Sequence, residues 1–234
     1  MAFVLIPGAG GSAWYWHRVE PELRKRGHDV VSVDLPADDD TAGLDEYAEA
    51  VIRAARQVDG QVSGGLVLVA QSMAGFTAPL VCDRLPVSLL VLVNAMIPAP
   101  GETAGEWWDN TGQGAARRAN DVRAGRTADA EFDVFTYFLH DLPQAVIDDS
   151  LPHQREQSDT PFGQPWPLKA WPDVPTRVLV ARDDRFFPVE FQRRVAEERL
   201  GITPDEMPGG HLVALGHPEE LADRLEAYRA DVRG

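Results

Sequence analysis

The chain has 234 residues, and 22 Lys and Arg stand against 37 Asp and Glu, which gives a formal net charge of −15 at pH 7. Because nucleic acids and anionic membrane surfaces carry charge of the same sign, this balance argues against either as a partner. An apolar share of 44% is ordinary for a globular protein and argues against a disordered chain. The single cysteine, Cys82, cannot form a disulfide within the chain, and no cysteine spacing typical of zinc sites occurs. The function predicted below implies no metal or organic cofactor.

The amino-terminal residues lack the pattern of a secretion signal. Residues 1–7 carry no positively charged side chain, and their apolar run is too short. No stretch of the chain approaches the roughly 18 consecutive apolar residues of a membrane-spanning helix. We therefore expect a cytoplasmic protein, either an enzyme or a binding domain, whose oligomeric state the sequence does not indicate.

Short apolar runs alternate along the chain with longer stretches of helical spacing. Strands are predicted over residues 3–6, 29–33, 65–70, 88–93 and 176–181, with a short one near 202–207. Helices are predicted over residues 14–26, 44–58, 73–85, 189–200 and 218–232. Near-continuous apolar strands that alternate with helices are typical of a parallel sheet covered on both faces. The sequence therefore predicts an α/β fold with a mostly parallel, doubly wound sheet.

This alternation stops between residues 95 and 171. The segment is too long for a simple connection and too rich in aromatic residues for a linker. We predict that it forms a mostly helical cap over the carboxyl ends of the strands, where open α/β sheets bind their ligands. Residues 1–94 and 172–234 would then make up one core domain around the insert at 95–171.

Aromatic residues of this insert are candidates for the wall of a substrate pocket. Four of them could enclose an apolar acyl or alcohol group under such a cap: Trp107, Trp108, Phe135 and Phe138. At least half of such aromatic residues usually form the core of the cap itself, so both roles stay open. Trp14 and Trp16, which lie outside the insert, are expected to pack as part of a helix rather than to contact substrate.

A glycine-rich loop follows the first predicted strand and has two interpretations. Residues 8–13 fit G-x-G-x-x-A, and Asp34 ends the next strand 21 residues later, which is the pattern of a dinucleotide-binding site. Large aromatic residues at 14–16 oppose this, because a pyrophosphate needs open backbone there. Neither lysine of the chain lies four residues after a tyrosine, as a short-chain dehydrogenase requires. In the other interpretation, backbone N–H groups of the loop form an oxyanion hole.

The third predicted strand runs directly into Ser72, and a helix follows. A nucleophilic serine on a sharp strand-to-helix turn needs small residues two positions away on either side, usually as G-x-S-x-G. Here Ala70 and Ala74 stand at the two glycine positions, and alanine meets the requirement for small size. The start of the helix also directs N–H groups toward the serine. Ser72 is therefore the candidate nucleophile, and the alternative is a serine that only caps a helix.

A nucleophilic serine needs a base, and the base needs an acid that orients it, in the chain order serine, acid, histidine for this kind of sheet. Asp184 is the preferred acid and Asp183 the alternative, because both come just after the strand at 176–181, on the carboxyl edge of the sheet. His211 is the predicted base, because it lies in a glycine-containing loop on the same edge, 27 residues after Asp184. The other histidines lie in or beside predicted helices or in the insert: His17, His28, His140, His153 and His217.

Together these segments make the chain similar to the α/β-hydrolase superfamily over essentially its whole length. It most resembles the small-cap branch that includes plant methyl esterases and hydroxynitrile lyases. The resemblance rests on residues 4–16, 70–75 and 184–188, and on 209–211 ahead of 218–221. It implies a catalytic triad of Ser72, Asp184 and His211. It also implies that the backbone N–H groups of Ala9 and Met73 form the oxyanion hole.

The sequence departs from this branch at three places. Pro7 stands where the family usually has histidine, and proline has no backbone N–H, so the loop must be supported differently. The alanines on either side of Ser72 replace glycines. Hydroxynitrile lyases of this branch carry a lysine directly after the catalytic histidine and a threonine near the oxyanion loop. This sequence has Leu212 and Gly8 there, so cyanide chemistry is disfavoured.

The predicted reaction is hydrolysis of a carboxylic ester or lactone of a small, partly apolar substrate. Ser72 attacks the carbonyl carbon, His211 takes the proton and returns it to the leaving group, and Asp184 fixes the imidazole tautomer. Two alternatives remain: a binding or sensing protein that keeps the triad but turns over slowly, and, less favoured, a nicotinamide-dependent oxidoreductase. No motif encodes the identity of the acyl or alcohol group.

Overall fold

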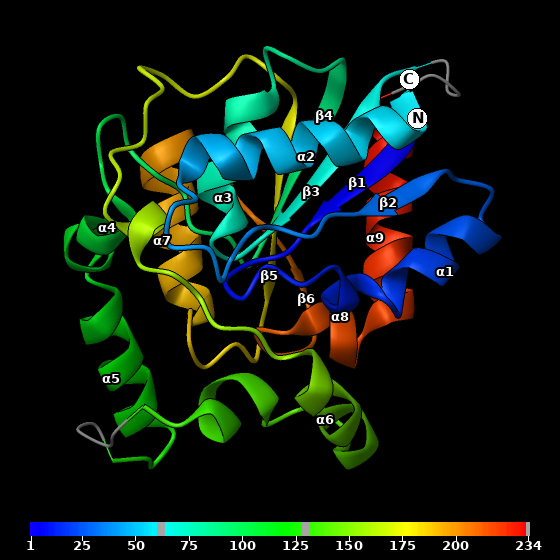
Figure 1. The fold of residues 1–234 in the computed structure, drawn as a ribbon. Helices are drawn as coiled ribbons and strands as arrows, with labels where there is room; N and C mark the ends of the chain where they lie inside the picture. The colour runs from blue at the N-terminus through cyan, green and yellow to red at the C-terminus, as the bar shows by residue number, and fades with distance from the viewer. Residues whose placement is uncertain (60–63, 128–131, 233–234) are drawn as a thin grey trace.

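The computed structural model describes residues 1–59, 64–127 and 132–232, which contain one six-stranded sheet (Figure 1). The strands lie in the order β2-β1-β3-β4-β5-β6, and each neighbouring pair is parallel. Their bounds are β1 Ala2–Ile6, β2 Val30–Ser32, β3 Leu66–Gln71, β4 Val87–Val93, β5 Thr176–Ala181 and β6 Asp205–Met207. The chain moves outward from β1 to β2 in one direction and from β3 to β6 in the other. The predicted doubly wound parallel sheet is confirmed.

Two sets of helices cover the two faces of this sheet. They are α2 (Leu44–Asp59), α3 (Ala74–Thr77) and α7 (Val189–Leu200) on one face, and α1 (Val19–Lys25), α8 (Val213–Gly216) and α9 (Pro218–Asp231) on the other. Strand β1 shows why both faces are apolar: Val4 and Ile6 join the cluster under α2, while Phe3 and Leu5 join the cluster under α9. Successive side chains of a strand point to opposite faces, so a strand buried on both sides is continuously apolar. No helix among the described residues is long and apolar enough to cross a membrane.

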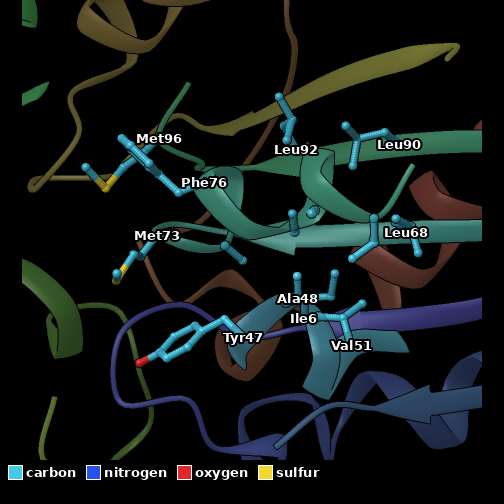
Figure 2. Close-up of a cluster of buried hydrophobic side chains, with 14 of the residues drawn as sticks. Ile6, Tyr47, Ala48, Val51, Leu68, Met73, Phe76, Leu90, Leu92 and Met96 are labelled. Atoms are coloured by element: carbon cyan, nitrogen blue, oxygen red, sulfur yellow. The ribbon is translucent and has the colours of Figure 1, made fainter. Parts of the chain in front are cut away.

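Figure 2 shows the cluster under α2, where the strand residues Ile6, Leu68 and Leu90 meet Ala48 and Val51 of that helix. All five side chains are buried. Full burial of a large aliphatic side chain contributes about 1.5–3 kcal/mol relative to its exposure. This packing holds β1, β3 and β4 in register, so that the loops at their carboxyl ends lie at one edge of the sheet.

Two predicted helices are divided in the structure. The first consists of a 3₁₀ turn, η1 (Ala13–Trp16), followed by α1. Pro21 lies in the first turn of α1 and has no N–H for the carbonyl four residues before it, so the two pieces cannot form one helix. The helix after β3 is α3 followed by the 3₁₀ turn η2 (Ala78–Val81), in which Pro79 has the same effect. The prediction of a continuous helix is therefore wrong at both places, whereas α2, α7 and α9 agree with it.

In its described part, the segment between β4 and β5 consists of helices and helical turns joined by irregular stretches (Figure 1, green to yellow). Its elements are α4 Ala104–Thr111, α5 Gln113–Arg123, the π-helix η3 Phe135–Leu139, α6 Gln144–Ser150, and the 3₁₀ turns η4 Leu151–His153 and η5 Thr160–Phe162. Residues 128–131 lie outside the described residues. Trp107 and Trp166 of this segment are buried in the cluster under α2, so part of the insert packs into the core. The division of the chain at residues 95 and 171 stays a prediction.

Candidate active site

Ser72 occupies a strained turn between β3 and α3. Its φ of +52° lies in a region that residues other than glycine rarely adopt. The Ser72 N–H donates to the carbonyl of Val93 at 3.3 Å, and the Ser72 carbonyl accepts from the N–H of Met96 at 2.9 Å. A Cβ added at Gly75 would lie 1.8 Å from the Met96 carbonyl oxygen, so the turn also needs glycine there. The structure thus supplies the crowded strand-to-helix turn that the pattern predicts.

Three side chains form a continuous hydrogen-bonded chain at this turn. The Oγ of Ser72 lies 3.0 Å from Nε2 of His211, and Nδ1 of His211 lies 2.8 Å from Oδ2 of Asp184. His211 and Asp184 are buried, and 9% of Ser72 is exposed. Ser72 is therefore the most exposed of the three side chains. The structure brings together the three residues predicted as nucleophile, base and acid.

The two adjacent aspartates differ in what they contact. Oδ1 of Asp184 accepts hydrogen bonds from the N–H groups of Phe186 and Phe187, both at 2.8 Å, which leaves Oδ2 for His211. Asp183 is exposed, and its Oδ2 accepts from the N–H of Gly209 at 3.1 Å. The geometry thus favours the first choice, Asp184. Asp183 instead contacts the loop before His211.

The glycine-rich loop after β1 faces the same serine. The N–H groups of Ala9 and Met73, predicted as oxyanion donors, have no hydrogen-bond acceptor among the described residues. Ala9 lines the cavity beside Ser72, and Met73 directly follows the serine. Asp34, the acid of the dinucleotide pattern, accepts a hydrogen bond from the N–H of Ala13 at 2.9 Å. That carboxylate therefore supports the loop itself.

The sequence profile of the Alpha/beta hydrolase family matches residues 3–224, which is nearly the whole chain. The chain belongs to the α/β-hydrolase family. The predicted resemblance is confirmed, and the match covers both the strand-to-helix turn at Ser72 and the loop at His211.

Proteins of similar sequence and solved structures of similar fold agree with that assignment. This hydrolase is 34% identical to the "Probable esterase PIR7A" of Oryza sativa subsp. indica, over 95% of this chain and 94% of that protein. It is 24% identical to "Methylesterase 8" of Arabidopsis thaliana, over 96% and 88%. The crystal structure of polyneuridine aldehyde esterase has the same fold, with a TM-score of 0.75, 20% identity, and coverage of 97% and 98%. The hydrolase is thus placed among the carboxylic ester hydrolases of the family.

A cavity of about 350 Å³ opens beside Ser72 and His211. Of the four aromatic residues proposed for its wall, Phe138 lines it, with its ring centroid 5.1 Å from that of His211. Trp107 instead is fully buried in the core, where its Nε1 donates to the Ile97 carbonyl at 3.1 Å. Trp108 packs against Phe186 and the same core cluster.

Of the two roles left open for these aromatic residues, packing describes Trp107 and Trp108, and the part that the four residues play in substrate binding stays a prediction. Phe135 is 59% exposed and lies outside the cavity, as do Trp107 and Trp108. Thr103 and Glu106 begin α4 with reciprocal hydrogen bonds of 3.0 Å. Trp107 on this helix packs into the core of the hydrolase.

Residues of η1 and η4 line the cavity where the sequence did not indicate them. Trp14 lies on the wall, and its ring stacks between those of His17, at 4.3 Å, and His153, at 4.7 Å. The expectation that Trp14 only packs within a helix is therefore corrected, whereas Trp16 is fully buried as expected. Tyr15 also lines the cavity, and burial raises the pKa of its hydroxyl above the usual value. Trp14 and Tyr15 directly follow the glycine-rich loop, and that position was the signal in the sequence that could have placed them at the cavity.

Asn94 is a further residue that the sequence reading missed. It follows β4, is fully buried, and adopts a φ of +45°. Its Nδ2 donates to the carbonyls of Gly210 and His211, both at 3.2 Å, and its Oδ1 accepts from the N–H of Ala181 at 2.7 Å. Asn94 thus ties the loop of the predicted base to the ends of β4 and β5. No group of three or more metal-ligating side chains occurs in the described part of the hydrolase.

Proposed function

We propose that this hydrolase cleaves carboxylic esters or lactones with Ser72 as nucleophile, His211 as base and Asp184 as the orienting acid. The observation that carries the proposal is the unbroken chain of hydrogen bonds from Ser72 Oγ through the imidazole to Asp184. Nucleophile and base lie within hydrogen-bond reach, and a third group orients the base, which is the geometry that activates a serine.

The reaction follows from these positions. Ser72 Oγ attacks the carbonyl carbon while its proton moves to Nε2 of His211, and the carbonyl oxygen becomes an oxyanion. The C–O bond to the alcohol then breaks, and His211 protonates the leaving alkoxide. His211 then takes a proton from a water molecule, which attacks the carbonyl carbon of the acyl-serine ester; the bond from that carbon to Ser72 Oγ breaks, His211 returns the proton to Oγ, and the acid is released. Asp184 keeps the proton on Nδ1 throughout, so Nε2 is free to accept.

The N–H groups of Ala9 and Met73 stabilise the oxyanion in this proposal. Two features support the assignment: they flank Ser72 from the loop after β1 and from the turn after β3, and they have no acceptor among the described residues. A donor aimed at an oxyanion commonly contributes about 3 kcal/mol to the transition state. No cofactor is needed for any of these steps.

The substrate is proposed to be small and partly apolar. The cavity of about 350 Å³ is lined by apolar side chains such as Phe138, Leu139 and Leu215, together with Ser72 and His211. A volume of this size suits a compact acyl or alcohol group. The esterase names of the relatives support an ester as the substrate class.

Cyanide chemistry of the hydroxynitrile lyase kind is disfavoured by two residues of the cavity. Leu212, directly after His211, presents an apolar side chain where those enzymes carry a lysine. A Cβ added at Gly8 would lie 2.8 Å from Cβ of Ser72, so this loop has no room for the threonine of those enzymes. Both residues favour hydrolysis of an ester over release of cyanide.

A serine-directed fluorophosphonate tests the proposal, with intact mass as the readout. Labelling of the wild type that disappears in Ser72→Ala, together with turnover of p-nitrophenyl esters, is the expected result. Labelling with negligible turnover across an ester panel would instead favour the sensing protein. Absence of labelling, combined with tight binding of a nicotinamide cofactor, would overturn the proposal.

A further inference from the structure

Gln71 is the last residue of β3 and directly precedes Ser72. Its side chain is buried and makes two hydrogen bonds to distant parts of the chain. Oε1 accepts from the N–H of Gly8 at 3.1 Å, and Nε2 donates to the carbonyl of His211 at 3.3 Å. One carboxamide therefore contacts the residue before the proposed oxyanion donor Ala9 and the residue proposed as base.

We propose that Gln71 is a positioning residue that holds the glycine-rich loop and the His211 loop in place relative to Ser72. This inference rests on the proposed function, because it concerns the alignment of groups that act on the same ester carbonyl. Gln71 does not need to touch the substrate for this role. It acts through the backbone of Gly8 and through the backbone of His211.

The loop after β1 shows why such support is needed. Pro7 has no N–H, so the N–H of Gly8 is the first donor after β1 that can anchor the loop. A buried N–H without an acceptor costs about 1–3 kcal/mol, and Gln71 removes that cost. A Cβ added at Gly8 would lie 2.5 Å from Oε1 of Gln71, so glycine is what lets the carboxamide come this close.

The chemistry of the side chain is specific to this task. The site requires one acceptor, for the N–H of Gly8, and one donor, for the carbonyl of His211, on the same buried side chain. A methionine has similar length but supplies neither strong group, whereas a neutral histidine supplies one donor and one acceptor.

Asn94 supports one of the two loops that Gln71 contacts, so only the other loop depends on Gln71 alone. The His211 carbonyl also accepts from Nδ2 of Asn94 at 3.2 Å, so the loop of the base has a second support. The N–H of Gly8 has Gln71 as its acceptor. Loss of Gln71 should therefore displace the oxyanion loop more than the base. It should reduce stabilisation of the transition state more than it reduces substrate binding.

The test compares Gln71→Met and Gln71→His with the wild type, and kcat is expressed per site titrated with fluorophosphonate. For hydrolysis of p-nitrophenyl acetate we expect Gln71→Met to lower kcat roughly tenfold to hundredfold, with KM changed less than about threefold, because loss of an oxyanion donor costs about 10²–10³ in kcat and a displaced donor costs part of that. A trifluoromethyl ketone, which forms an oxyanion on the serine, should lose affinity in parallel with kcat. Gln71→His should recover most of the activity.

Thr111→Val is the matched control, because it removes a buried hydrogen bond, Oγ1 to the Trp107 carbonyl at 2.6 Å, in α4. We expect its kcat and KM to equal those of the wild type. The inference is overturned if Gln71→Met keeps wild-type kcat, if Gln71→His recovers nothing, or if Gln71→Met does not fold. A wild type that hydrolyses no ester and takes no label would instead contradict the proposed function.

Discussion

Two regions of the molecule enclose Ser72, the proposed nucleophile, and they are held in different ways. On the sheet edge, Asp184 accepts two backbone hydrogen bonds besides that of His211, and Asn94 ties the base loop to two strands. On the opposite wall, η3 and η4 contribute Phe138 and the ring stack of His153 on Trp14. The first region is fixed by directional bonds to buried backbone, and the second by ring contacts near solvent. We therefore expect substitutions to affect chemistry at the edge and substrate preference at the wall.

The largest effect should come from the acid at the sheet edge. Asp184→Asn should lower kcat roughly 10⁴-fold, because an amide cannot hold the imidazole in the tautomer that accepts the serine proton. Hydrolysis of p-nitrophenyl acetate measures this. Asp183→Asn is the control and should stay within about tenfold of the wild type, since Asp183 contacts Gly209 rather than His211. The reverse order would reassign the acid.

One part of the insert is buried in the core and another part lines the cavity, and substitution of Trp107 tests whether the two parts act separately. Trp107→Ala should destabilise the protein by about 3–5 kcal/mol, because a fully buried indole leaves a large cavity. Denaturant unfolding gives the value. Phe135→Ala, at a residue 59% exposed, should change stability by less than about 0.5 kcal/mol. A change in ester preference in folded Trp107→Ala would show that the two parts are not separate.

Glu102 anchors the start of the insert to α7 and makes stability depend on pH. Burial acts to raise the pKa of Glu102, but hydrogen bonds from Arg199, from the Ala99 N–H and from Asn110 outweigh it and lower the pKa. A carboxyl with a lowered pKa stabilises the fold above its unfolded pKa, and this contribution is lost as the pH falls through the folded pKa. Glu102→Gln should cost about 1.5–3 kcal/mol at neutral pH, the usual contribution of hydrogen bonds to a charged group. Unfolding at several pH values should show that difference shrink below about pH 4, and a constant difference would contradict the assignment.

The smallest effect is expected at the wall. Phe138→Ala should reduce kcat/KM for p-nitrophenyl butyrate roughly tenfold, because the loss of buried ring area weakens binding of the longer acyl chain. The acetate ester should be affected less. Equal losses for both esters would mean that Phe138 acts on the imidazole of His211, whose ring centroid lies 5.1 Å from that of Phe138, rather than on the substrate.

The residues that the sequence predicted share one property. Ser72 and Asp184 each follow an apolar strand closely, and His211 follows the short last strand, β6. In a parallel sheet all such positions lie at the same edge, so the predicted order of strands and loops was enough to place the three residues together. Trp14 and Trp107 show where that reasoning ends. Both are tryptophans near predicted helices: Trp14, which was expected to pack, lines the cavity, and Trp107, for which both roles stood open, is buried in the core.

The sequence by itself determined the parallel α/β sheet and the family, and it predicted Ser72, Asp184 and His211 at one edge of the sheet, because each depends on local patterns and on a general rule for strand ends. Tertiary structure decided which side chains form the wall of the cavity, and it revealed the contacts of Gln71 and Asn94 with the loops at Gly8 and His211. Those contacts join residues up to 140 positions apart. They depend on how the insert and the loops pack in space, which no periodicity along the chain records.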